Sequence, residues 1–332
     1  MTDPVADSLM IAARTAASAG AWGDVRATLE RDETGAMANG SRAMLLGEAC
    51  LRTGDPRTAM RWLDLAAPML TQTGNRPSLR AVFNLQGAAA FALGALGRAE
   101  ISFGAALNMA QLDSDAMLSA RATNNLGLIA ALRGDIEAAI ASYQRAITAY
   151  QRMGHPLGLA ESWHNLGISY KTRGELTAAD EAERSAIEYA VEARNPRLAA
   201  MSQVGRAEIA LRRGDPAWSR ATLMRAIQVF SALPDYLLEA DALWLLADAC
   251  DQANLLSESE LALARSLELA QRHGHRLQEA QAYQTDALIS SRRGNRARAR
   301  EMGTRAIEIF REIGSFSAVE DVSEMLAQLA AE

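Results

Sequence analysis

The sequence predicts an all-α fold, a right-handed superhelical solenoid built from antiparallel helix pairs. Three observations carry this prediction. Alanine, leucine, arginine and glutamate dominate, with 5% aromatic residues and only 8 prolines among 332 residues, a composition that favours helices. A glycine recurs every 40 residues, and several columns of small residues share that period. A fixed repeat of this length is typical of solenoids.

The recurring glycine marks the turn inside each predicted helix pair. The column contains Gly54, Gly94, Gly134, Gly174, Gly214 and Gly294, with Asn254 in the remaining place. Glycine, and less often asparagine, adopts the left-handed conformation that closes a helix. We therefore expect a helix of about 14 residues to end at each of these positions. A second helix should begin at once, often with an acidic residue in its first turn, as at Asp55, Asp135, Glu175 and Asp215.

Three further columns contain only small residues. Seven residues before the turn stand Gly47, Gly87, Gly127, Gly167, Ala207, Ala247 and Ala287. Five residues after it stand Ala59, Ala99, Ala139, Ala179, Ser219, Ser259 and Ala299. Twelve residues after it stand Ala66, Ala106, Ala146, Ala186, Ala226, Ser266 and Ala306. Small residues at these places let two helices approach closely, while apolar residues spaced by three and four face the partner helix.

The register divides the chain into repeats of one predicted domain that spans 5–332. The predicted repeats cover 5–39, 40–79, 80–119, 120–159, 160–199, 200–239, 240–279 and 280–317. The first repeat is the shortest, and only Gly20 and Trp22 fit its pattern well. Residues 318–330 continue the pattern of a first helix, so we expect a lone helix there that caps the stack with a polar face.

One repeat carries a recognisable family pattern. Trp163-His164-Asn165-Leu166-Gly167 is followed by Tyr170, Gly174, Ala179 and Ala186-Ile187. This series resembles the tetratricopeptide repeat, whose usual period is 34 residues. The 40-residue period is similar to that of kinesin light chain, LGN-type adaptors and MalT- or Rap-type bacterial regulators. On this resemblance, the six extra residues lengthen the second helix and the turn after it.

The resemblance implies that the first helices of the pairs line a concave binding groove. Three columns on one face of these helices are expected to point into it. The first column is Ser41, Ala81, Arg121, Glu161, Met201, Asp241 and Gln281. The second column is Met44, Asn84, Asn124, His164, Val204, Trp244 and Gln284. The third column is Glu48, Ala88, Leu128, Ile168, Glu208, Asp248 and Leu288.

Two parts of this lining are candidate binding sites. The first is a polar ladder of Asn84, Asn124, Asn125, His164 and Asn165. Amide side chains both donate and accept hydrogen bonds, which suits an extended peptide backbone. The alternative is that Asn125 and Asn165 bond within their own repeats.

The second candidate site surrounds Trp244. Asp241, Asp248 and Asp251 lie on the same predicted helix, so an acidic patch around an exposed aromatic ring would favour a basic partner. The alternative is that Trp244 packs against the neighbouring repeat. Met201 and Val204 lie between the two sites and predict an apolar middle.

Composition excludes several other classes. The formal net charge is −6, with 34 basic and 40 acidic residues interspersed, which does not favour nucleic acid. The sequence has neither a membrane-length apolar run nor a signal peptide, so a cytoplasmic protein is predicted. Cys50 and Cys250 should be reduced core thiols, because helices five repeats apart are too distant for a disulfide. His273 and His275 alone fall short of a metal site.

The sequence therefore predicts a non-catalytic scaffold or adaptor that binds a protein or peptide, without cofactor or metal. The alternative is a peptide-responsive regulator that acts by a conformational change of the solenoid. Regulators of this kind generally need an output module. Because the repeats begin within about ten residues of the start, the sequence leaves no evident room for one.

Overall fold

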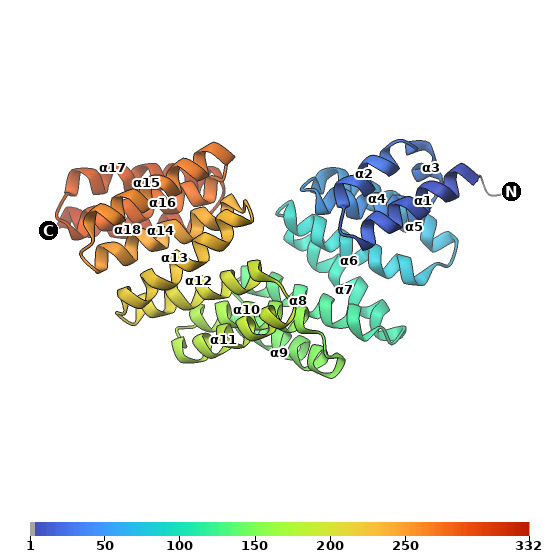
Figure 1. The fold of residues 1–332 in the computed structure, drawn as a ribbon, viewed down its shortest axis with the longest axis horizontal. Coiled ribbons are helices and arrows are strands. Elements are labelled where there is room, and N and C mark those ends of the chain that lie inside the picture. Colours follow the sequence, from blue (N-terminus) through green and yellow to red (C-terminus); the bar gives the residue numbers. More distant parts are fainter. Residues whose placement is uncertain (1–3, 332) are drawn as a thin grey trace. The chain divides into compact units, whose positions relative to one another are not determined.

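The computed structural model describes residues 4–331, which form helices joined by short turns and contain no strand (Figure 1). In order, the helices are α1 (Pro4–Ser18), α2 (Trp22–Glu30), α3 (Glu33–Ala38), α4 (Gly40–Arg52), α5 (Pro56–Gln72), α6 (Arg76–Ala92), α7 (Leu96–Leu112), α8 (Ala116–Leu132), α9 (Ile136–Met153), α10 (Pro156–Thr172), α11 (Leu176–Glu192), α12 (Pro196–Arg212), α13 (Pro216–Ala232), α14 (Tyr236–Gln252), α15 (Leu256–His273), α16 (Arg276–Arg292), α17 (Arg296–Glu312) and α18 (Phe316–Ala331). The predicted all-helical solenoid of tandem helices is confirmed.

Both helices of a pair have nearly the same length, which corrects one expectation. From α5 to α17 each helix has 17 or 18 residues, whereas the sequence predicted about 14 for the first helix and placed the extra residues in the second. The first helices begin about four residues before the predicted repeat boundaries; α8, for example, begins at Ala116. A helix cap outside the glycine columns sets this start. Asp115 accepts a hydrogen bond from the Leu118 N–H, so α8 begins directly after Asp115.

The predicted turn residues adopt the left-handed conformation. Gly54, Gly134 and Gly174 have φ of 82°, 82° and 85°, and Asn254, which replaces glycine in the column, has φ of 60°. The turns between successive pairs use the same conformation, with glycine at some of them and Ser114 (φ 55°) or Arg194 (φ 52°) at others. This second set of turns has no uniform residue type, so it left no clear column in the sequence.

The acidic residues after the turns act as helix caps. Asp55, Asp135 and Asp215 each accept a hydrogen bond from the backbone N–H three residues later, at 3.0 to 3.1 Å. They therefore precede the first turn instead of lying in it. Glu175 occupies the same position but caps no backbone N–H through its side chain.

The small-residue column explains how the helices of a pair approach each other. A Cβ added at Gly47, Gly87 or Gly127 would lie 2.5 to 2.8 Å from a large side chain of the second helix. Those side chains are Leu63, Phe103 and Tyr143, which are almost fully buried. A larger residue in this column would force the pair apart.

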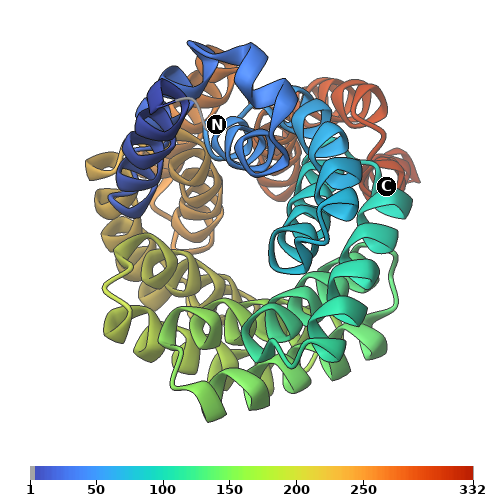
Figure 2. The same ribbon diagram turned by 90° about the vertical axis from the view of Figure 1, so that its right-hand side faces the viewer.

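The chain divides into two compact units, residues 1–158 and 159–332. In the first, α1 to α9 pack as sequential neighbours around a core that includes Leu46, Leu63 and Phe103. In the second, α11 to α18 pack in the same sequential way around clusters that include Leu223, Phe230 and Phe310. Figure 2 shows this antiparallel, neighbour-to-neighbour order within each unit. The prediction of one domain over 5–332 stays a prediction.

Two sequence expectations concern the chain as a whole. Cys50 and Cys250 are both buried and free, as predicted, and burial raises the pKa of the Cys50 thiol to about 11. None of the helices between residues 4 and 331 is both long and apolar enough to cross a membrane.

Candidate functional site

The second unit contains a pocket of about 250 Å³ between its first helices α10, α12, α14 and α16. We call it the groove pocket. Its lining residues are His164, Ile168, Lys171, Glu183, Met201, Val204, Gly205, Glu208, Phe230, Leu238, Asp241, Trp244, Leu245 and Gln281. The lining combines apolar side chains with polar and charged ones, the usual character of a ligand site.

Eight of these residues belong to the three columns assigned to the groove from sequence. They are Met201, Asp241, Gln281, His164, Val204, Trp244, Ile168 and Glu208. Among the residues singled out as a site, the pocket brings together His164, Met201, Glu208, Asp241 and Trp244. Their common placement follows from the 40-residue register, which repeats one helical face from pair to pair.

A buried histidine–glutamate pair forms one wall. His164 Nδ1 lies 2.9 Å from Glu183 Oε2 and 3.2 Å from Ser202 Oγ. The Glu183 side chain is 1% exposed and that of His164 is 12% exposed. With Nδ1–H donated to the carboxylate, the imidazole ring is held in one orientation and Nε2 is the nitrogen left for another partner.

Glu183 occupies a position that is apolar in the neighbouring repeats. The residues 40 positions apart in this column include Leu63, Phe103, Tyr143, Leu223 and Leu263. Glu183 lies on α11, a second helix, so the analysis of first-helix columns missed it. Comparing the second helices in the same register would have found this single acid among apolar residues.

Two glycines make room for the Glu183 carboxylate. A Cβ at Gly205 would lie 2.5 Å from Glu183 Oε1, and one at Gly167 would lie 2.9 Å from Glu183 Cγ. Gly167 belongs to the small column that most repeats share, whereas the positions 40 residues on either side of Gly205 hold Asn165 and Leu245. The site therefore has a glycine where the equivalent positions carry larger side chains.

Asp241 lies on the opposite side of the pocket. Burial raises the pKa of its carboxyl to about 6, and the hydrogen bond from Gln278 Nε2, at 3.2 Å, acts against that rise. The Trp244 indole also approaches the carboxyl closely enough to favour its ionised form, but Trp244 Nε1 makes no hydrogen bond of acceptable geometry. Gln281 Oε1 is likewise buried without a hydrogen-bond partner. The pocket lining thus contains one hydrogen-bond donor, Trp244 Nε1, and one acceptor, Gln281 Oε1, that have no partner.

The third polar part of the wall is an ion-paired cluster. Lys171 contacts Glu208, and Glu208 also pairs with Arg212 at 2.8 Å. Lys171 thus reaches Glu208 of the next repeat, and the two basic groups together balance the charge of the Glu208 carboxylate.

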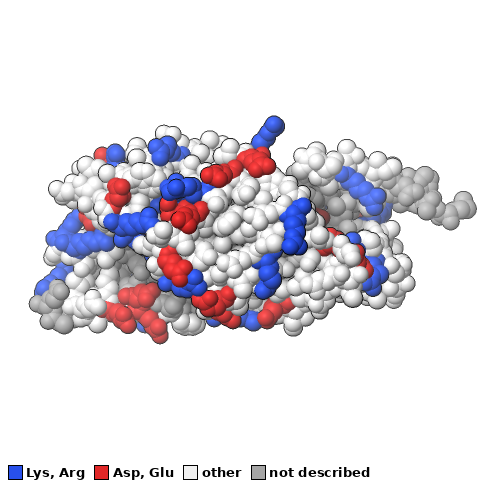
Figure 3. All heavy atoms as spheres, turned by 90° about the horizontal axis from the view of Figure 1, so that it is seen from below, with Lys and Arg blue, Asp and Glu red and all other residues white. Residues whose placement is uncertain are grey.

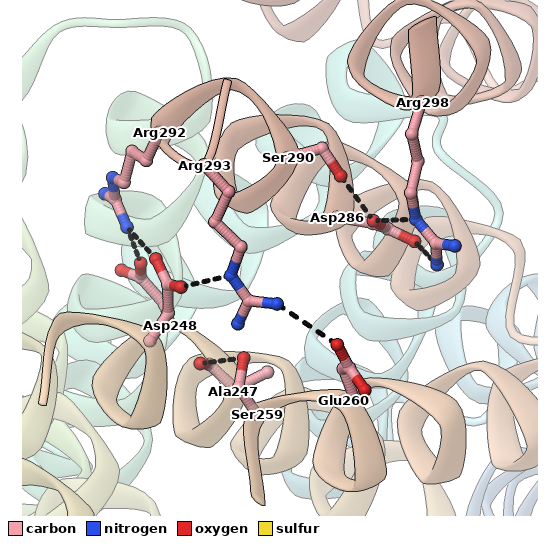
Figure 4. Close-up of polar contacts among 10 residues, drawn as sticks. Ala247, Asp248, Ser259, Glu260, Asp286, Ser290, Arg292, Arg293 and Arg298 are labelled. Atoms are coloured by element: carbon pink, nitrogen blue, oxygen red, sulfur yellow. Dashed lines mark hydrogen bonds and ion pairs between the residues drawn. The ribbon is translucent and has the colours of Figure 1, made fainter. Parts of the chain in front are cut away.

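Two of the three aspartates predicted to form an acidic patch around Trp244 are neutralised by arginines at the end of α16. Asp248 is ion-paired with Arg292, and Asp251 with Arg293 at 2.9 Å. Figure 4 shows Arg292 directed at Asp248 and Arg293 extended toward Glu260. Trp244 is partly buried against the cores of its own and the neighbouring repeat, not freely exposed. The arginines lie 41 to 44 residues after their aspartate partners in the sequence. Ion pairs between successive repeats are therefore not visible when one helix is considered alone.

A second hollow of about 380 Å³ adjoins the groove pocket. It shares Glu208, Trp244 and Leu245 with that pocket and extends to Asp248 and Arg292. The two hollows together continue along α12, α14 and α16.

The asparagine ladder is divided between the two units. In the first unit Asn84 and Asn124 are buried, and Asn125 Nδ2 donates to Asn84 Oδ1 at 3.4 Å. This bond links successive repeats, so it differs from the bond within one repeat that was the alternative. Arg121 is exposed on α8.

The remaining ladder residues, His164 and Asn165, lie on α10, as does Glu161 of the first groove column. Glu161 is exposed and Asn165 half-buried, and both make polar or electrostatic contacts. Neither lines the groove pocket.

The described residues give little support for a metal site or a nucleic-acid interface. In the part of the chain that the structure describes, no three His, Cys, Asp or Glu side chains group as metal ligands. His273 stacks on Tyr236 with ring centroids 4.1 Å apart. On the face seen in Figure 3, basic and acidic side chains are interspersed, which does not resemble a nucleic-acid surface.

The comparisons with known proteins agree with this fold. Residues 118–190 match the family model described as tetratricopeptide repeat. No curated protein matches the sequence. Among solved structures, the chain is similar to a Rap protein complexed with Competence and Sporulation Factor, with a TM-score of 0.65, 11% identity and 98% of each chain covered.

Two other solved structures extend this similarity. The apo quorum sensor NprR from B. thuringiensis has a TM-score of 0.59 and 13% identity, with 98% of this chain and 97% of that one covered. The STAND protein PH0952 from Pyrococcus horikoshii, which has a tetratricopeptide repeat sensor, has a TM-score of 0.62 and 15% identity, with 79% and 42% covered. At these identities the likeness shows the fold alone, a tetratricopeptide-like solenoid.

Proposed function

We propose that this protein is a non-catalytic scaffold that binds an extended peptide segment of a partner in the groove pocket. The observation that carries the proposal is the pair of unused polar atoms in the pocket wall, Trp244 Nε1 and Gln281 Oε1. A peptide backbone offers one acceptor and one donor per residue, and small rotations of these two side chains would let it satisfy both. Buried polar atoms left unpaired are costly, so a ligand that pairs them gains affinity.

The apolar centre of the pocket supports the same occupant. Met201, Val204, Phe230, Leu238 and Leu245 supply a surface for one or two side chains, and a volume of about 250 Å³ is below that of typical sites for drug-sized molecules. Methionine adapts to side chains of different shape. The adjoining hollow along α12, α14 and α16 would extend the contact to further residues of the segment.

The asparagine region of the first unit, Asn84, Asn124 and Asn125, is a separate candidate binding region. Asn124 and Asn125 lie on a first helix, as do the residues of the groove pocket. Because Asn84 and Asn124 are buried, their replacement would disturb packing as well as binding. Variants of the groove pocket therefore test the proposal more cleanly.

The test is selection of random 12-residue peptides displayed on phage against the full chain, followed by titration of the enriched peptides. Met201→Glu and Trp244→Ala should each weaken binding at least tenfold. Leu261→Ala is the matched control, because Leu261 is 72% exposed on the second helix α15 and lies outside the pocket. Enrichment of no peptide, or binding that is unchanged in both pocket variants, would refute the proposal.

A peptide-responsive regulator is the second candidate. It is favoured by the similarity in fold, over 98% of the chain, to a Rap protein whose structure contains Competence and Sporulation Factor and to the quorum sensor NprR. On this reading, an enriched peptide changes the distance between spin labels placed in residues 1–158 and 159–332. An unchanged distance distribution on saturation would favour the scaffold.

A further inference from the structure

The carboxylates of the groove pocket differ in how their charge is balanced. Glu183 is held by His164 at 2.9 Å, and Glu208 is paired with Lys171 and Arg212. Among residues 4–331 Asp241 has no basic partner; its neighbours are neutral donors, Gln278 Nε2 at 3.2 Å and the nearby Trp244 indole. The pocket therefore contains one carboxylate whose charge the protein itself does not neutralise.

Among the described residues, no basic side chain pairs with Asp241, since Lys171 of the same pocket is engaged with Glu208. Asp235, at the start of the same helix, further disfavours ionisation of the Asp241 carboxyl. Arg197, the basic residue near that end of the helix, is engaged with Asp235 at 2.6 Å. Gln278 and Gln281, which come from α16, are neutral. A buried carboxylate without a counter-charge is unfavourable unless a charged partner arrives from outside.

Gln281 adds a second acceptor next to this carboxylate. Asp241 and Gln281 occupy the same column on the adjacent first helices α14 and α16, and Gln281 Oε1 has no partner. The Trp244 ring lines the same pocket. Two acceptors beside an aromatic ring suit a group that carries several N–H donors and a positive charge, because such a group bonds both oxygens and is attracted to the ring face.

We propose that Asp241 and Gln281 form a subsite for the cationic side chain, arginine or lysine, of the bound peptide segment. This inference rests on the proposed peptide-binding function. The charged end donates to the Asp241 carboxylate and to Gln281 Oε1, and the aliphatic stem lies on the apolar centre formed by Met201 and Leu245. The Trp244 indole N–H remains available to a backbone carbonyl of the same segment.

The experiment compares the peptides enriched in the selection above with matched analogues. Each arginine is replaced in turn by citrulline, which keeps its shape and loses its charge, and each lysine by norleucine. One such replacement should lower affinity for the wild-type protein at least tenfold and for Asp241→Asn less than threefold. Exchange of arginine for lysine then distinguishes recognition of the guanidinium fork from recognition of charge alone.

Asp251→Asn is the matched control, because this aspartate lies on the same helix, lines neither hollow and is already paired with Arg293. It should keep the full discrimination between arginine and citrulline, and Gln281→Met should reduce it. Enriched peptides that bind the groove pocket without a shared cation, or an equal loss with citrulline in wild type and Asp241→Asn, would overturn the subsite and leave the proposed function standing. Failure of any peptide to bind overturns both.

Discussion

Replacing Asp241 by asparagine should make the unliganded protein more stable at neutral pH. Asparagine keeps the shape of the side chain and an acceptor for Gln278, and it removes the charge. The pKa of the Asp241 carboxyl is raised from 3.8 to about 6, so the folded state binds this proton more tightly than the unfolded state. With about 1.4 kcal/mol for each pKa unit, ionised Asp241 costs about 3 kcal/mol of unfolding free energy above pH 6.

The sign and the pH window follow from linkage. Between pH 4 and pH 6 the unfolded chain has released the proton and the folded chain still holds it, so the stability of the wild-type protein falls as pH rises. The gain from Asp241→Asn should therefore be about 0.5 kcal/mol at pH 4, about 1.5 kcal/mol at pH 5 and about 3 kcal/mol at pH 7. Other groups titrate in this range, but they are common to both proteins and cancel in the difference.

The assay is urea denaturation of both proteins from pH 4 to pH 8, followed by circular dichroism. Asp248→Asn provides the control, because it breaks an ion pair with Arg292 and should lower stability instead of raising it. A difference between wild type and Asp241→Asn that does not grow with pH would show that Asp241 is not an unbalanced buried charge. A residue that stabilises the protein when removed and binds ligand when present fits a trade of stability for function.

Three further sets of substitutions test the packing and the turns of the repeat by urea denaturation. Glu183→Leu should cost about 1 to 3 kcal/mol, because His164 Nδ1 keeps only Ser202 Oγ, at 3.2 Å, as a partner. Adding His164→Val should recover most of that loss, and equal stability of the single variant and wild type would contradict this. Gly205→Ala should cost about 1 to 3 kcal/mol, because its Cβ would lie 2.5 Å from Glu183 Oε1. Gly104→Ala, whose surroundings on α7 are open, should gain about 0.5 to 1 kcal/mol, and a loss at both glycines would argue against a local clash. Asn254→Ala should cost about 1 kcal/mol and Asn254→Gly nothing, since only the alanine is strained at φ 60°; equal melting temperatures of the two variants would count against the turn assignment.

The groove columns could be predicted from sequence because they depend on local periodicity. His164, Val204 and Trp244 recur at 40-residue steps on equivalent helical faces, and the structure brings them to one pocket. The same method failed for charge. Asp248 and Asp251 look like an acidic patch when α14 is considered alone, and only the neighbouring helix α16 supplies the arginines that neutralise them.

The two sets of turns differ in how clearly the sequence marks them. Glycine repeats at the turn inside each pair, so that column is visible in the sequence. The turns between pairs require the same backbone conformation, but Ser114 and Arg194 adopt it in place of glycine. The pairs consequently begin about four residues before the boundaries that the visible column suggested.

The sequence by itself determined the helical class, the 40-residue register, the left-handed turns and the faces of α10, α12, α14 and α16 that line the groove pocket. These features depend on interactions within one pair, which the spacing of small, apolar and turn-forming residues specifies. Tertiary structure decided which polar groups in the groove remain unsatisfied. Glu183 is balanced by His164, and Asp248 by Arg292, whereas Asp241 has no basic partner in the described chain. Whether a charge is neutralised depends on side chains that reach across from neighbouring helices, and the repeat pattern of one helix does not specify those contacts.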